Sequence, residues 1–163
     1  QQPHPPLAVA AFGRKGLAQA ARWGLPYLAS PMEPFDLIAE NLEFHRGEKR
    51  NGAPVDEAVV PIMRTIFVSE DRDTLAKVYA KLEAERRPPS VKLPKAIARA
   101  AAAPFEERVV VGNPDEVRER LARYCNELNM NLLIGRPHIG GASQAQQEAS
   151  MRTLIEEIVP SLQ

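Results

Sequence analysis

The chain has 163 residues, the length of one ordinary domain, and its 21 basic side chains balance its 21 acidic ones. This zero net charge argues against a nucleic-acid binder, which needs a basic excess or a basic stripe. A single cysteine excludes an intramolecular disulfide, and with only three histidines it excludes a Cys/His zinc site, so we expect no metal. No apolar run approaches the ~20 residues that cross a bilayer, and the first residues lack a signal-peptide pattern. We therefore expect a cytoplasmic protein that binds neither nucleic acid nor membrane.

The first structural unit covers residues 7–30. Its apolar run Leu7–Ala11 is long enough for a strand buried on both faces, and a short basic loop at 12–16 follows. Apolar side chains then recur at helical spacing as far as Gly24, a natural helix end, and a second apolar run covers 25–29. Strand, helix and strand in this order form one βαβ unit, which predicts neighbouring parallel strands.

The middle of the chain predicts one more strand and two more helices. We expect a helix over 33–46, a strand within the apolar run 58–68, and a second helix that starts at the cap 69–71 and ends near Glu85. Residues 86–107 have the least regular pattern, with three prolines near their start and an alanine run after them. We interpret them as an excursion that contains a short helix.

The last third begins with the strongest helix start of the chain. Asn113 is a candidate N-cap, Pro114 fits the first helical position and Glu116 completes a capping-box pattern. The expected buried stripe of this helix is Val117, Leu121, Tyr124 and Leu128. A strand is expected at 131–135. A last helix follows a cap at Ser143 and is lined by Met151, Leu154, Ile155 and Ile158.

Four strands therefore alternate with helices, which predicts an α/β fold. The alternation alone does not distinguish a doubly wound sheet from part of a (β/α)₈ barrel, and a whole barrel typically needs about 250 residues. In either arrangement we expect Trp23 to be buried between layers and Cys125 to pack in the core.

Five motifs, in order along the chain, resemble the luciferase-like flavin-dependent monooxygenase family. They are Pro5–Ala11, Ala20–Pro26, Met63–Val68, Gly112–Val117 and the segment from Ser150 to Pro160. The likeness is to the C-terminal half of that family's barrel. It implies about four TIM-barrel-type βα units, the last four of a (β/α)₈ barrel, as one domain over 1–163 with an insertion at 86–107.

In such barrels the chemistry lies at the C-terminal ends of the strands. The basic loop after the first strand would lie at a helix N-terminus, where free N–H groups favour an anion. In the resembled family this loop contacts the flavin phosphate, although here it lacks the family's serine and threonine. The predicted cofactor contacts are Phe12, Gly13, Arg14, Lys15 and Gly16, and an ordinary solvated turn is the alternative.

Two other loops supply the remaining candidates. His138, in the loop after the fourth strand, is the candidate catalytic residue, for proton transfer or for orienting a flavin intermediate, and a structural histidine is the alternative. Arg136 in the same loop would line the substrate pocket, or form a salt bridge. Ser30 and Met32, after the second strand, would line the same pocket by their position.

The resemblance implies an enzyme that uses reduced FMN, or in some branches a deazaflavin, together with O₂ to oxidise a small organic substrate. A separate flavin reductase would supply the reduced flavin. The family takes much of its pocket from four earlier βα units, so this half alone is expected to be inactive. It would pair with a missing N-terminal half or with a second copy of itself. A non-catalytic flavin-binding or assembly module is the alternative function, and another phospho-ligand enzyme is a third possibility.

Overall fold

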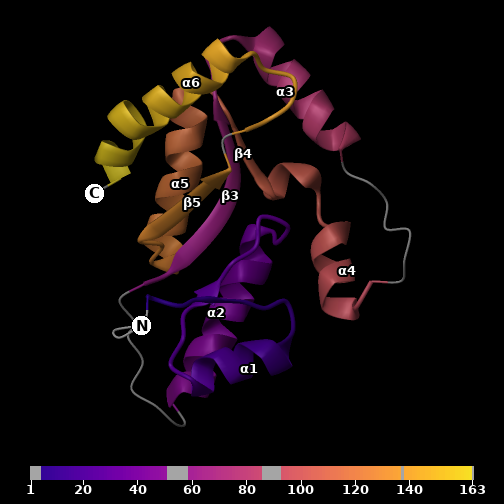
Figure 1. Ribbon diagram of the computed structural model, residues 1–163, viewed down its shortest axis with the longest axis vertical. Coiled ribbons are helices and arrows are strands. Elements are labelled where there is room, and N and C mark those ends of the chain that lie inside the picture. Colours follow the sequence, from indigo (N-terminus) through magenta and orange to yellow (C-terminus); the bar gives the residue numbers. More distant parts are fainter. Residues whose placement is uncertain (1–4, 51–58, 86–92, 137, 163) are drawn as a thin grey trace.

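The computed structural model describes residues 5–50, 59–85, 93–136 and 138–162, in which parallel strands alternate with helices (Figure 1). The α/β prediction is confirmed. Within these residues none of the helices combines the length and the apolar composition needed to cross a membrane.

The first unit contains β1 (Val9–Ala10), α1 (Arg14–Arg22) and β2 (Tyr27–Leu28). β1 and β2 pair in parallel, which confirms the βαβ prediction. The expected strand at Leu7–Ala11, buried on both faces, is wrong in length and burial, because Leu7 is 53% exposed. The physical reason is that β1 pairs only with β2 among the described strands, so its other edge and one face lack neighbours.

The long strand β3 (Pro61–Val68) is the central strand of a second sheet, in the order β4 (Val109–Gly112), β3, β5 (Leu132–Arg136), which one bridge joins to the pair β1-β2. β5 pairs with the first half of β3, from Pro61↔Leu132 to Thr65↔Arg136. On the opposite edge, β2 extends to β3 through the bridge Ala29↔Ile62, and β4 pairs with the second half. All of these pairings are parallel. β4 was not predicted, since four residues directly before a strong helix cap give too short a pattern to identify a strand.

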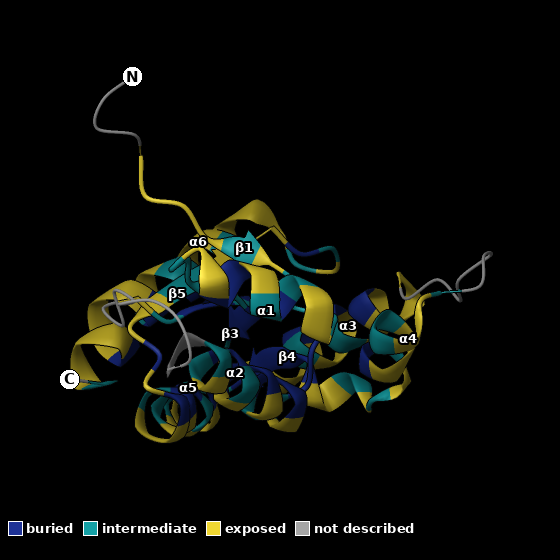
Figure 2. Ribbon diagram, turned by 90° about the horizontal axis from the view of Figure 1, so that it is seen from below, coloured by how far each residue is buried: buried dark blue, intermediate teal, exposed yellow. Residues whose placement is uncertain are grey.

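One face of the sheet is covered by α1, α2 (Phe35–Arg50), α5 (Pro114–Leu128) and the last helical segment. That segment consists of α6 (Gln144–Thr153), the π-helical turn η2 (Leu154–Ile158) and the 3₁₀ turn η3 (Val159–Leu162). The main core lies between these helices and the sheet; its fully buried members include Leu17, Ile38, Ile62, Val117, Leu121 and Ile158. In Figure 2 the central strands are buried, whereas the segment leading to β1 is exposed.

A second, smaller core lies on the other face of β3. It joins Phe67, Val109, Val111 and Ile139 to α3 (Arg72–Ala84). The helices α4 (Lys95–Ala102) and η1 (Phe105–Glu107) follow, and α4 stands apart from the sheet (Figure 1). The short helix expected in the excursion is therefore present, and residues 86–92 of that excursion lie outside the described residues. Arg99 of α4 forms two hydrogen bonds of 2.7 Å with the Glu40 carboxylate of α2.

The predicted helix starts are confirmed. Asn113 accepts a hydrogen bond from the Glu116 amide and its own amide donates to the Glu116 carboxylate, which completes the capping box of α5. Ser143 forms the same reciprocal pair with Gln146 at the start of α6. The expected stripe of α5, from Val117 to Leu128, is buried.

Two predicted core residues are exposed. Trp23 has 63% of its surface exposed, so its predicted burial is wrong; it follows α1 on the flank where β1 lacks a neighbour. Ile155 is 57% exposed although Leu154 and Ile158 are buried. The buried residues of this helical segment, Ser150, Leu154 and Ile158, recur every four residues, and Ile155 lies outside that line, as does the exposed Val159. Cys125 is half-buried and packs against the main core, close to the prediction, and burial raises the pKa of its thiol.

Candidate functional site

The N-terminus of α1 lies directly after the C-terminal end of β1. Gly13 is its N-cap with extended backbone, so Arg14 and Lys15 occupy the first helical turn instead of a preceding loop. The first intrahelical bond runs from the Leu17 amide to the Gly13 carbonyl, which leaves the amides of residues 14–16 without intrahelical acceptors. These amides and the positive end of the helix dipole are therefore available to bind an anion.

The two glycines of this segment have different roles. A side chain at Gly16 would lie 3.0 Å from Cβ of Ala11, so Gly16 allows α1 to pack closely on the end of β1. At Gly13 nothing lies within 4 Å of the position that a Cβ would occupy, which keeps the helix start accessible. Phe12 is half-buried beside it.

Arg14 and Lys15 add two exposed positive charges, and the first turn of α1 contains no acidic residue. The Arg14 guanidinium lies over the ring of Phe44, 4.5 Å from its centroid. This cation–π contact holds the guanidinium against α2. The residue types and their arrangement therefore fit a phosphate group.

The turn after β2 lies beside this helix start, because Ala10 of β1 pairs with Leu28 of β2. Ser30 is half-buried, and its hydroxyl accepts a hydrogen bond from the Met32 amide at 3.2 Å. Met32 is one of the exposed large apolar residues. The structure thus brings Ser30 and Met32 to the strand end next to Gly13.

A buried polar network underlies the same turn and was missed by sequence reasoning. The Glu33 carboxylate accepts hydrogen bonds from the Tyr27 hydroxyl, the Asn41 amide and the Ser30 backbone N–H. Burial raises the pKa of Glu33, and these hydrogen bonds reduce the increase. Burial and the neighbouring Glu33 also raise the pKa of Tyr27. The available signal was Arg64, a charged residue in the middle of the apolar run Pro61–Val68.

The end of β5 and the loop after it hold the other two candidates: Arg136 is the last residue of the strand and not part of the loop as predicted, because it pairs with Thr65 of β3, and His138 lies in the loop. Arg136 is exposed, and its guanidinium lies 3.9 Å from the Glu85 carboxylate, which is the salt-bridge arrangement considered as its alternative. His138 is exposed and borders an open groove of about 780 Å³ with Gln147, Met151 and Arg152 of α6. None of the residues lining this groove belongs to the α1 start or to the turn after β2.

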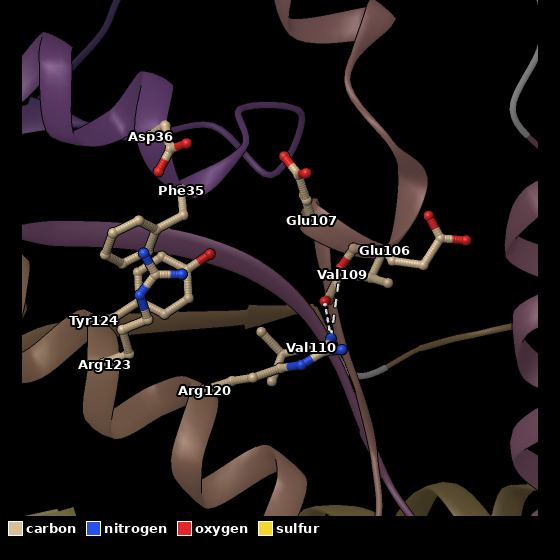
Figure 3. Close-up of a pocket in the computed structure, with 9 residues that line it drawn as sticks. All are labelled: Phe35, Asp36, Glu106, Glu107, Val109, Val110, Arg120, Arg123 and Tyr124. Carbon is tan, nitrogen blue, oxygen red and sulfur yellow. Dashed lines mark hydrogen bonds between the residues drawn. The ribbon is translucent and has the colours of Figure 1, made fainter.

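A separate cavity of about 350 Å³ lies between α2, η1 and α5 on the helix-covered face (Figure 3). Its two arginines already have partners: Arg120 donates to the Val109 carbonyl at 3.1 Å, and Arg123 lies 3.8 Å from the centroid of the Phe35 ring. Because it opens between helices and not at the strand ends, we do not include it in the candidate site. Among the described residues no three His, Cys, Asp or Glu side chains are grouped to hold a metal ion.

Solved structures share this fold. Monooxygenase RslO1 from Streptomyces bottropensis superposes with a TM-score of 0.73 at 21% identity, over 100% of this chain and 50% of its own. Apo-MsnO8 superposes with a TM-score of 0.69 at 25% identity, over 96% of this chain and 52% of its own. A third structure is the oxygenating constituent of 3,6-diketocamphane monooxygenase from Pseudomonas putida in complex with FMN. It superposes with a TM-score of 0.63 at 14% identity, over 96% of this chain and 48% of its own. The chain thus spans about half the length of these proteins.

A comparison with curated protein sequences gives no match. A family model described as luciferase-like monooxygenase matches residues 1–128, which include β1 to β4 and the whole of α5. Since this match covers most of the sequence, and the similar structures have the same α/β arrangement over the whole chain, the chain belongs to the luciferase-like monooxygenase family.

Proposed function

We propose that the chain forms the C-terminal half of a flavin-dependent monooxygenase that uses reduced FMN and O₂ to oxidise a small organic substrate. The observation that carries this proposal is the family match over residues 1–128. When bound, the flavin would supply the oxygen chemistry, and the protein would bind and orient it and exclude water. A separate reductase would supply the reduced flavin, and a deazaflavin is the alternative cofactor.

The flavin phosphate would bind at the N-terminus of α1. The amides of residues 14–16 would donate hydrogen bonds to it, and Arg14 and Lys15 would add charge-assisted contacts. The open space at Gly13 supports the fit. Phe12 and Gly16 would shape the same loop.

The substrate would lie near the turn after β2, against Ser30 and Met32, with Arg136 at the C-terminal end of β5 on the other side of β3. His138 would transfer a proton or orient the flavin once the barrel is complete. A flavin-binding module without catalysis would instead bind FMN and show no turnover with an added reductase.

The rest of the pocket would come from four further βα units that complete the barrel. Two flanks of the sheet support this, because each exposes large apolar side chains: Leu7 and Trp23 at β1 and α1, and Leu132, Ile155 and Val159 at β5 and the helical segment after it. Exposed apolar groups of this kind indicate contact surfaces. We propose that residues 1–163 act as one half-barrel domain, with 86–107 as an insertion.

The phosphate assignment can be tested by removing both charges in the protein with a complete barrel. Arg14→Ala combined with Lys15→Ala should weaken FMN binding by about 2–3 kcal/mol, since two charge-assisted contacts are lost and solvent screens part of each. The measurement is the quenching of FMN fluorescence on titration with protein. The matched control, Arg22→Ala combined with Lys95→Ala, removes the same charge elsewhere and should bind FMN normally. Equal affinities of the two double variants would refute the assignment.

A further inference from the structure

A fully buried arginine lies in the middle of the central strand. Arg64 of β3 faces the helix-covered layer, where its neighbours Ile62 and Ile66 belong to the apolar core. Burying a guanidinium is costly unless each of its N–H groups finds an acceptor. An apolar residue would fill this position at lower cost, so the hydrogen bonds that Arg64 makes indicate its role.

Two of those hydrogen bonds go to one turn, and Nη1 also donates to the Met63 carbonyl of β3 at 2.9 Å. Nη1 of Arg64 donates to the Ser30 carbonyl at 2.9 Å, and Nη2 donates to the Glu33 carbonyl at 3.0 Å. Nε donates to the Tyr124 hydroxyl at 2.8 Å, which holds the guanidinium plane from the side of α5. The arginine therefore holds both ends of the four-residue turn 30–33 by their backbone.

Glu33 holds the same turn from within. One carboxylate oxygen accepts the Ser30 backbone N–H at 2.7 Å, and the other accepts the Tyr27 hydroxyl at 2.6 Å and the Asn41 amide at 2.7 Å. The amide and carbonyl of Ser30 are thus both bound by buried charged side chains. Three elements, β2, α2 and β3, determine the shape of one short turn.

The turn presents Met32 outward and lies beside the α1 start, since β1 and β2 are adjacent parallel strands. A ligand with its phosphate at the amides of residues 14–16 would extend past this neighbouring strand end. We infer that Arg64 and Glu33 are positioning residues that fix the Ser30–Glu33 turn as a wall of the flavin pocket. This inference rests on the proposed function.

The test compares Arg64→Lys and Glu33→Gln with wild type in the protein with a complete barrel. A lysine offers one ammonium where the guanidinium bridges two carbonyls. A glutamine amide would face the Tyr27, Asn41 or Ser30 donors with a donor of its own. Arg120→Lys is the matched control, because Arg120 also donates to backbone carbonyls, of Glu106 and Val109, but does not contact the turn. If Glu33→Gln does not fold, Tyr27→Phe removes one bond to the same carboxylate.

Two measurements are made on each folded variant: hydrogen exchange of the backbone amides of Ser30, Met32 and Glu33, and the Kd for FMN. Both test variants should exchange these amides roughly tenfold faster and bind FMN roughly tenfold more weakly, with wild-type values for Arg120→Lys. Unchanged exchange would overturn the inference, because the network would not hold the turn. Faster exchange with unchanged FMN affinity would also overturn it, because the turn would not be a wall of the pocket. Failure of the wild type to bind FMN would overturn the proposed function instead.

Discussion

The centre and the flanks of the sheet differ in how completely they are buried. Seven of the eight residues of β3 are buried, whereas both residues of β1 and all five of β5 keep some or much of their surface exposed. β3 has neighbours on both edges and packed side chains on both faces, while each flanking strand has one described neighbour. The centre is therefore complete within this chain, and the flanks are where further structure would contribute.

The largest effect should come from the centre. Leu121→Ala removes a fully buried side chain between α5 and the sheet, and we expect a loss of about 3 kcal/mol in the free energy of unfolding. Leu132→Ala on β5, where the leucine is 45% exposed, should cost less than about 1 kcal/mol. Urea denaturation of both variants measures the difference. Similar losses would show that the flank is already packed, and a larger loss for Leu132→Ala in a complete barrel would identify it as a contact.

Stability measured over a range of pH tests the buried hydrogen-bond network of Glu33 beside β3. Burial raises the pKa of Glu33 above its ordinary value of 4.5, so the folded chain binds this proton more tightly than the unfolded chain. The resulting stability is fully present below pH 4.5 and is lost as the pH rises through the folded-state pKa. The stability of wild type should therefore fall with rising pH relative to Glu33→Gln, as measured by urea denaturation at each pH.

Asp71 is the control, because its pKa is shifted in the opposite direction to that of Glu33. Hydrogen bonds from Thr74 and from the Asp73 amide hold the pKa of this exposed N-cap carboxyl below its ordinary value of 3.8. The contribution of Asp71 to stability is present above that value and is lost as the pH falls through the folded-state pKa. The stability of wild type should therefore rise with rising pH relative to Asp71→Asn, the reverse of the change expected for Glu33→Gln. A difference between wild type and Glu33→Gln that stays constant from pH 4 to 7 would contradict the prediction for Glu33.

The smallest effect is expected on the flank at Trp23, the sole tryptophan of the chain. Because it is mostly exposed, Trp23→Ser should change the free energy of unfolding of this chain by less than about 0.5 kcal/mol. Its fluorescence should be readily quenched by acrylamide, and a complete barrel should protect it, with Trp23→Phe providing the background. Equal quenching in both forms would contradict a contact surface at α1.

The features that were predicted correctly depend on neighbours in the sequence. The capping box at Asn113 and the stripe from Val117 to Leu128 each involve residues within one helix, so spacing alone identified them. The exposure of Trp23 and of Ile155 depends on what lies beside α1 and beside the last helical segment, and the spacing of apolar residues within one helix does not show this.

The candidate site was predicted only in part for the same reason. Loop positions after strands indicated Gly13, Arg14, Ser30 and Met32, and the pairing of β1 with β2 places these loops together. The network of Glu33 and Arg64 links residues 31 positions apart and could not be derived from spacing. The arginine within an apolar strand was a visible signal, but its acceptors are backbone carbonyls of a distant turn, which no side-chain pattern reveals.

The pairing of β3 has a consequence for how the chain folds. Ala29, which forms a single bridge with β3, lies before α2, β4 lies after α4, and β5 lies after α5, so each partner of β3 is separated from it by at least one helix. Contacts of such high sequence separation require large loops to close before they stabilise anything, which slows folding. The unit β1–α1–β2 can form locally, whereas β3 acquires β4 and β5 only after residues 109–136 have been synthesised. Until then most of each edge of β3 is unpaired and can pair incorrectly. We therefore expect aggregation during synthesis to begin at this strand.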